Sequence, residues 1–172
     1  ERQKPLLSDT AFRKNFTNET GSDDSFRFLK NLTGLWVLKE CQRTWQIDGD
    51  PYDYPDLVRE ASTARSLKAT LDLDDPCFSQ PSDDMPDRIC QYCREHALSP
   101  PSTIGETVRL ILESLAHAYG NTLRMLEEIV GQQLPVLHIV GGGSRNELLC
   151  QMTANACGCT VVTGPTEAAG IG

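Results

Sequence analysis

One stretch near the end of the chain constrains the fold most, because strand, glycine loop, helix and strand patterns follow one another in it. Residues 136–140 form a short apolar run rich in β-branched residues, and residues 160–163 form another. Three glycines follow the first run, and residues 144–157 have a helical pattern. A helix between two strands lets them lie parallel, so this stretch predicts a buried parallel α/β unit. We expect His138 to be a core histidine and a further helix to start at Thr166.

Helical periodicity dominates the sequence before this unit. Apolar residues between Ile104 and Ile129 recur at alternating steps of three and four, which is close to the helical repeat. Ser102 opens this segment and Gly131 closes it, so we expect one long helix that serves as a core scaffold. We also expect three shorter helices and two exposed loops; the helices are placed at 25–47, 54–65 and 85–98, and the loops at 1–24 and 71–86.

The charge balance narrows the classes of partner. The chain has 172 residues, with 16 Lys and Arg against 24 Asp and Glu, which gives a net charge of −8. No basic run is longer than a dipeptide, so no nucleic-acid partner is expected. No stretch reaches the apolar length of a membrane span, so no membrane partner is expected either. The charged N-terminal segment has no apolar run behind it, so we expect no signal peptide and a cytoplasmic protein.

The cysteines and acidic pairs do not form a recognisable metal motif. The chain has seven cysteines, which is an odd number. We expect reduced thiols, because we expect no secretory signal. Cys90 and Cys93 have the spacing of half a zinc site, but a second such pair and suitably spaced histidines are missing. The acidic pairs at 74–75 and 83–84 fall in an expected loop and are interpreted as solvated charge. The sequence therefore predicts no metal site.

The glycine loop carries the clearest chemical signal. Glycines at 141–143 lack Cβ atoms, so their amides can approach a ligand closely and the backbone can adopt positive φ. Ser144 and Glu147 stand at capping-box spacing, which predicts a helix start at Ser144. A helix N-terminus favours phosphate through its free amides and its dipole. The loop has neither the Walker A spacing nor Gly-x-Gly-x-x-Gly, so a nucleotide cradle and a tight structural turn both stay open.

Two blocks of sequence resemble a known family. Leu-His-Ile-Val-Gly-Gly-Gly-Ser-Arg-Asn at 137–146 and Gly-Pro-Thr-Glu-Ala at 164–168 look like the C-terminal domain of the FGGY carbohydrate kinases. That family belongs to the superfamily of actin and the heat-shock ATPases. Asn-Phe-Thr-Asn-Glu at 15–19 and Arg-Phe-Leu-Lys-Asn-Leu-Thr-Gly-Leu-Trp at 27–36 resemble, within that family, the kinases of L-rhamnulose. The blocks stand in the family's order, more than 100 residues apart.

The resemblance implies a fold and an activity. The fold would be α/β, the C-terminal part of an actin-like, ribonuclease H-like ATPase domain of the sugar-kinase type, helix-rich with a small sheet. Residues 1–172 would be a partial nucleotide-binding domain, with the N-terminal sugar-binding domain outside them. The activity would be ATP-dependent phosphorylation of L-rhamnulose to L-rhamnulose 1-phosphate, with Mg²⁺ neutralising the phosphates. Three alternatives stay open: another FGGY kinase acting on fuculose, xylulose or a polyol, a non-catalytic nucleotide-binding relative, and a scaffold without a ligand.

The same resemblance implies roles for individual residues. Asn31 would contact the sugar; the alternative is an ordinary asparagine on a helix surface. Lys39 stands where the family usually has a Gln that faces ATP, and it would either meet a phosphate as a point charge or lie solvated on a helix. The catalytic Asp would precede residues 1–172, so no catalytic residue is expected within them. The residues expected to bind ATP are Gly141, Gly142, Gly143, Asn146 and Lys39.

Overall fold

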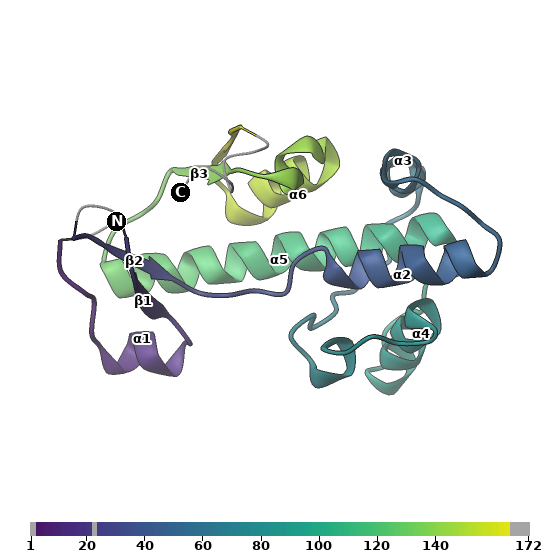
Figure 1. Cartoon of the computed structure of the whole chain (residues 1–172), viewed down its shortest axis with the longest axis horizontal. Coiled ribbons are helices and arrows are strands. Elements are labelled where there is room, and N and C mark those ends of the chain that lie inside the picture. The colour runs from purple at the N-terminus through teal and green to yellow at the C-terminus, as the bar shows by residue number, and fades with distance from the viewer. Residues whose placement is uncertain (1–2, 22–23, 166–172) are drawn as a thin grey trace.

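One long helix, α5 (Ile104–Val130), organises the molecule, and the other elements lie along it (Figure 1). A computed structural model of the chain describes residues 3–21 and 24–165, so the helix start expected at Thr166 lies outside the described residues. The other helices and 3-10 turns are α1 (Asp9–Arg13), α2 (Trp36–Ile47), α3 (Tyr54–Thr63), η1 (Pro76–Phe78), α4 (Met85–Glu95), η2 (Gly142–Arg145) and α6 (Glu147–Cys157). The strands are β1 (Thr17–Thr20), β2 (Phe26–Leu29), β3 (Val136–Ile139) and β4 (Thr160–Thr163).

The helix α5 has a defined start and end. Thr103 is its N-cap, one residue after the expected Ser102, and the Thr103 Oγ1 accepts the Glu106 amide at 3.1 Å. Gly131 ends the helix in the left-handed conformation, with φ +71°. This confirms the long scaffold helix that the periodicity predicts. Across residues 3–21 and 24–165, neither α5 nor any other helix is long and apolar enough to cross a membrane.

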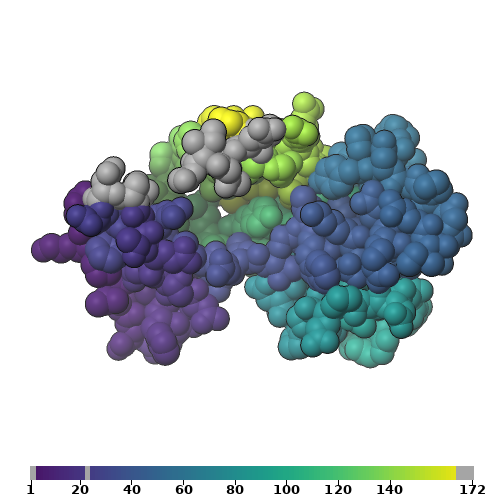
Figure 2. Space-filling view, viewed as in Figure 1, coloured from purple at the N-terminus to yellow at the C-terminus, as the bar shows by residue number. Residues whose placement is uncertain are grey.

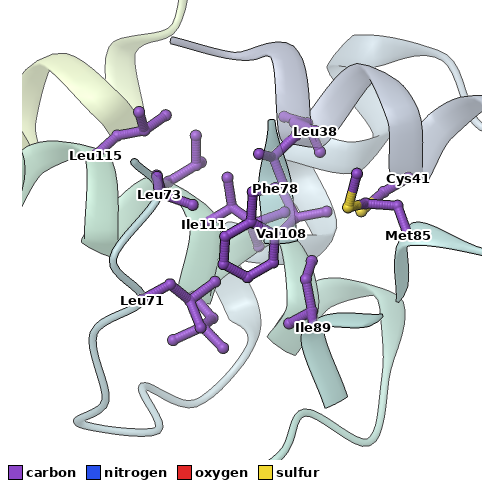
Figure 3. Close-up of a cluster of buried hydrophobic side chains, with 14 of the residues drawn as sticks. Leu38, Cys41, Leu71, Leu73, Phe78, Met85, Ile89, Val108, Ile111 and Leu115 are labelled. Carbon is purple, nitrogen blue, oxygen red and sulfur yellow. The ribbon is translucent and has the colours of Figure 1, made fainter. Parts of the chain in front are cut away.

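The hydrophobic core lies where α2 and α4 pack against the N-terminal half of α5, and Figure 3 shows Phe78 in its middle. Phe78 is fully buried, and Leu71 and Leu73 are buried beside it. The Leu71 amide donates to the Ser114 Oγ of α5 at 2.9 Å. The expectation that residues 71–86 form an exposed loop is therefore wrong for these apolar residues. The prolines and aspartates turn the chain, while the apolar residues bind it to the core.

Two glycines let α3 and α6 approach α5 closely. A Cβ atom at Gly105 would lie 2.8 Å from the carbonyl oxygen of Glu60 in α3. A Cβ atom at Gly120 would lie 2.7 Å from the carbonyl oxygen of Ala156 in α6. Because real side chains do not tolerate such short contacts with backbone, both positions need glycine for packing. The long helix therefore fixes where α3 and α6 lie, and α6 follows the glycine loop.

The N-terminal residues form a small lobe, drawn in purple in Figure 1. Strands β1 and β2 pair antiparallel, and the rings of Phe16 and Phe28 stack with centroids 5.0 Å apart. Because β2 is a strand, the helix that follows begins only at Trp36. The expectations of a loop at 1–24 and of a helix from Ser25 are therefore wrong. Pairing of the two strands and stacking of the two rings override the helical spacing of the apolar residues.

A linker at residues 30–35 joins this lobe to α2. In Figure 2 the linker is a narrow band between the purple lobe and the blue surface of α2 and α3. The Lys30 ammonium donates to the Lys14 carbonyl at 2.9 Å, and the Lys14 side chain forms an ion pair with Glu128 of α5. These contacts attach the lobe and the start of the linker to the C-terminal half of α5.

Strands β3 and β4 pair in parallel, with α6 connecting them, which confirms the predicted α/β unit. The strands are not buried, however, because exposure alternates along them and Val136 and Val140 are exposed. Leu137 and Ile139 point to the other face and are half-buried. His138 is exposed, so the expectation of a core histidine is wrong. An apolar run predicts burial on both faces, whereas this sheet has one covered face.

Candidate nucleotide-binding site

The glycine loop joins β3 to α6, and its backbone closes on itself. Gly141 has φ +77° and ψ −163°, a conformation that only glycine adopts without strain. Its carbonyl accepts the Ser144 amide at 3.1 Å and the Ser144 hydroxyl at 2.7 Å. Its amide donates to the Pro165 carbonyl at 3.1 Å. Gly141 is therefore required by the turn itself, as the structural interpretation of the loop expects.

The turn does not explain the other two glycines. Gly142 and Gly143 are not in the left-handed region. A Cβ atom at either position would find no atom of the described chain within 4 Å. The backbone at these two positions therefore faces open space immediately before the N-terminus of α6. A helix N-terminus with free amides attracts a phosphate group, so the open space suits a nucleotide.

Asn146 caps α6, and Ser144 does not. The Asn146 Oδ1 accepts the Leu149 amide at 2.9 Å, whereas Ser144 lies in η2 and its hydroxyl is bonded to Gly141. The capping box expected for Ser144 and Glu147 is therefore wrong. The glycines allow a turn of 3-10 helix after β3, and this turn moves the start of α6 to Glu147.

The Asn146 side chain also contacts α3. It is 1% exposed, and its Nδ2 donates to the hydroxyl of Tyr54 at 2.8 Å. Burial raises the pKa of Tyr54 above its ordinary value, so this phenol stays protonated at neutral pH. Both polar ends of the Asn146 side chain are thus bonded within the protein. A contact between Asn146 and ATP stays a prediction.

An apolar cavity of about 490 Å³ lies beside the loop. Leu32 and Leu35 of the linker form one wall of the cavity, and Tyr119 and Leu123 of α5 form another. Gly143 of the glycine loop also lines it. The cavity therefore joins two segments that are more than 100 residues apart in the sequence. These are the segments that carry the two family-like blocks.

The predicted sugar and phosphate contacts lie on the linker and on α2. Asn31 is exposed in the linker, next to the cavity wall at Leu32, so it is not the helix-surface residue of the alternative interpretation. Lys39 is exposed on α2, and the described residues give its side chain no ion pair or hydrogen bond. The structure brings the linker and the glycine loop together at the cavity, and Lys39 is not among the residues that line it. The roles of Asn31 and Lys39 stay predictions.

Two hydrogen bonds fix the path of the linker past the cavity. The Thr33 amide donates to the Asp74 Oδ1 at 3.1 Å. The indole Nε1 of Trp36 donates to the Phe78 carbonyl at 3.1 Å. Trp36 of the Gly-Leu-Trp block therefore ties the linker to the hydrophobic core.

The acidic pairs have structural roles that the sequence analysis missed. Asp75 caps η1 by accepting the Cys77 amide at 2.8 Å, and this hydrogen bond lowers the pKa of the Asp75 carboxyl. Asp84 caps α4 by accepting the Asp87 amide at 2.8 Å. The interpretation of these pairs as solvated charge is therefore incomplete. A pattern of Asp before a Pro-containing helix start could have revealed the Asp84 cap.

The cysteines are free thiols in this structure. Cys93 is buried in α4, and Cys90 lies half-buried with its Sγ 3.7 Å from the Pro101 carbonyl oxygen. Burial raises the pKa of both thiols, which disfavours the thiolate form that binds metals. In the part of the chain that the structure describes, no three His, Cys, Asp or Glu side chains come together as a metal site.

The family model of the FGGY carbohydrate kinases, C-terminal domain, matches residues 1–172, which is the whole chain. The chain belongs to this family. The match confirms the expected fold class, and the FGGY C-terminal domain is helix-rich with small sheets here. The chain is similar along its length to rhamnulokinases from Bacteroides thetaiotaomicron (41% identical), Oceanobacillus iheyensis (36%) and Bacillus subtilis (36%). Each match covers 100% of this chain and 34%, 36% and 35% of the relative, so the chain spans about a third of the length of these curated relatives.

The sequence analysis missed one polar residue of this candidate site. Tyr54 reaches Asn146 across 92 positions of sequence, and nothing in the motif around Tyr54 signals that contact. The sequence indicated part of the apolar wall, because Leu32 and Leu35 belong to the family-like block at 27–36. Tyr119 and Leu123 belong to the helix that the sequence predicts as a scaffold, and their place beside the loop follows from the packing of α6 on α5.

Proposed function

We propose that this domain is the nucleotide-binding part of an ATP-dependent kinase that converts L-rhamnulose into L-rhamnulose 1-phosphate. The observation that carries the proposal is the shared cavity, which the linker lines with Leu32, the neighbour of Asn31, and which the loop lines with Gly143. Relatives named rhamnulokinase, matched along the whole chain, support this sugar over other substrates of the family. We place the protein in the cytoplasm, where ATP is available.

The proposed reaction is a transfer of the γ-phosphoryl group. The 1-hydroxyl oxygen of the sugar attacks the γ-phosphorus, and the bond to the bridging oxygen of the β-phosphate breaks to release ADP. The amides at Gly142 and Gly143 and the N-terminus of α6 would face the phosphates of the nucleotide. The carboxylate that takes the hydroxyl proton lies outside residues 1–172 in this proposal. Mg²⁺ would be held by the phosphates of ATP, which it neutralises.

Lys39 adds a cation to this proposal. Its side chain is exposed on α2, and we place its ammonium near the phosphates when the kinase closes over its bound substrates. A Lys acts as a single point charge, so it would attract any phosphate oxygen without fixing its orientation. Asn31 supplies a neutral amide, which suits hydrogen bonds to sugar hydroxyls.

A coupled ADP-release assay tests the proposal. The full-length protein is assayed with ATP, Mg²⁺ and, in parallel, L-rhamnulose, L-fuculose, D-xylulose and glycerol. We expect strong preference for L-rhamnulose. Preference for another sugar would keep the kinase and overturn the substrate, whereas ADP binding without turnover would favour a non-catalytic relative. Absence of both binding and turnover would overturn the function.

A further inference from the structure

The contact between α3 and the glycine loop is not used by the proposed reaction. Tyr54 lies in the first turn of α3, where Asp53 is the N-cap and Pro55 follows. The Asp53 Oδ1 accepts the Asp56 amide at 2.8 Å, and the Pro55 ring restricts the backbone. The phenol of Tyr54 therefore projects from a rigid part of the fold. Close packing of Gly105 against Glu60 holds α3 itself against α5.

Asn146 occupies the centre of a hydrogen-bond network at the end of the loop. Its backbone amide donates to the Gly143 carbonyl at 3.1 Å, and its carbonyl accepts the Cys150 amide at 2.9 Å. Its side chain accepts the Leu149 amide at 2.9 Å and donates to Tyr54 at 2.8 Å. A side-chain amide with 1% exposure and bonds at both ends has one favoured orientation. Tyr54 supplies the bond that comes from another element of the fold.

We propose that Tyr54 is a positioning residue for the nucleotide loop: it orients Asn146, and through Asn146 it fixes the carbonyl of Gly143 beside the open space. The inference rests on the proposed function of this loop as the nucleotide site. In this account α3 supports the loop from outside, while α6 continues directly from the loop. Tyr54 itself touches no nucleotide in this account, because its hydroxyl is directed at the Asn146 amide.

Loss of the Tyr54 hydroxyl leaves the Nδ2 of a buried asparagine without this acceptor. A buried donor without a partner is unfavourable, so Asn146 turns or shifts to reach water. The backbone N–H of Asn146, which donates to the Gly143 carbonyl, then holds that carbonyl less firmly. The loop amides are then no longer preorganised for the phosphates, and ordering them on binding reduces the affinity for the nucleotide.

Tyr54→Phe tests this prediction in the full-length protein, with ADP as the probe and calorimetry as the measurement. We expect ADP affinity to fall about three- to tenfold, the effect of one internal hydrogen bond. Tyr52→Phe is the matched control, because Tyr52 is two positions away and its hydroxyl makes no hydrogen bond within the described ranges. Unchanged ADP affinity in Tyr54→Phe, or equal losses in the two variants, would overturn the proposal.

A double-mutant cycle shows whether Tyr54 acts through Asn146. Asn146→Ser keeps an oxygen that can cap α6 but removes the Nδ2 that reaches Tyr54. In this background we expect Tyr54→Phe to cause no further loss of ADP affinity. A merely structural effect of Tyr54 would persist there, and persistence would overturn the positioning role.

Hydrogen exchange separates this inference from the function on which it rests. In the absence of nucleotide, Tyr54→Phe should speed exchange of the Asn146 and Leu149 amides, while Tyr52→Phe should leave both unchanged. Unchanged exchange in Tyr54→Phe would overturn the positioning role whatever the protein binds. If the wild type binds no ADP, the proposed function fails, and these two amides alone decide the role of Tyr54.

Discussion

Glycine serves two different purposes in two regions of this domain. Along α5, a Cβ atom at Gly105 or Gly120 would lie 2.8 Å or 2.7 Å from a backbone carbonyl oxygen of a neighbouring helix. In the loop after β3, a Cβ atom at Gly142 or Gly143 would meet no atom of the described chain within 4 Å. The first two glycines let helices touch. The other two border a space that the described residues leave open.

This difference separates stability from ligand binding. In the packed region a new side chain must displace α3 or α6, so it should lower the free energy of unfolding. In the loop a new side chain fits without strain, so it should leave the fold intact and take only the space of a ligand. Gly141 belongs to neither class, because its positive φ makes it a requirement of the turn. Variants in the two regions therefore test two separate claims.

The largest expected effect is in the packed region. Gly120→Val places a branched side chain against the Ala156 carbonyl, so α6 must move away from α5. We expect the free energy of unfolding to fall by about 3 kcal/mol, the upper part of the range for overpacked interiors. Chemical denaturation measures it. The control is His117→Val on an exposed position of α5, which should change stability by no more than about 0.5 kcal/mol. Equal stabilities for the two variants would show that α5 and α6 are not in close contact.

A second prediction compares the two sequence blocks at the cavity. Asn31→Ala removes an exposed amide from the linker and leaves the glycine loop untouched. We expect kcat/KM for L-rhamnulose to fall about tenfold, the effect of losing a hydrogen bond or two to the sugar, with ADP affinity unchanged. Steady-state kinetics and ADP titration measure the two quantities. Equal losses in both would mean that the variant disturbs the fold and that Asn31 has no separate role at the sugar.

The smallest expected effect concerns acid and the start of α5. Hydrogen bonds from Ser102 and the guanidinium of Arg65 lower the pKa of Glu106 to about 2. The lowered pKa means that ionised Glu106 stabilises the fold above its ordinary pKa of 4.5, and that this contribution is lost as pH falls toward 2. Glu106→Gln should therefore be less stable than the wild type at pH 7. The difference should shrink as pH falls from 5 to 2 in thermal unfolding, and a constant difference would contradict the lowered pKa.

Two similar sequence patterns show how far local reasoning reaches. Thr103 and Glu106 stand at the same spacing as Ser144 and Glu147, yet only the first pair includes the helix cap. The second serine follows three glycines, which allow a 3-10 turn, and the cap passes to Asn146. A local pattern shows that a cap is possible. The conformation of the preceding loop decides which residue forms it.

Periodicity predicted the helices whose one apolar face meets the core, as at α3, α4 and α5. It failed at β2, because Phe26 and Phe28 are followed by apolar residues at helical spacing while the partner strand β1 is polar. It also failed at the connection 71–86, where burial comes from distant helices. The glycine loop and the block at 27–36, which contains the linker, could be recognised in the sequence as motifs. Their shared cavity depends on the path of the whole chain, and the contact of Tyr54 with Asn146 does too.

The central claim is that the glycine loop leaves its space for a nucleotide, and Gly142→Val tests it most directly. The full-length wild type and variant are titrated with ADP, and their unfolding is measured in parallel. We predict an affinity at least about tenfold weaker, because the side chain would occupy ligand space. We predict unchanged unfolding, because the added Cβ meets no atom of residues 3–21 and 24–165 within 4 Å. Gly142→Ala should give a smaller loss in the same direction. Equal ADP affinity in the wild type and a normally folded Gly142→Val variant would contradict the account.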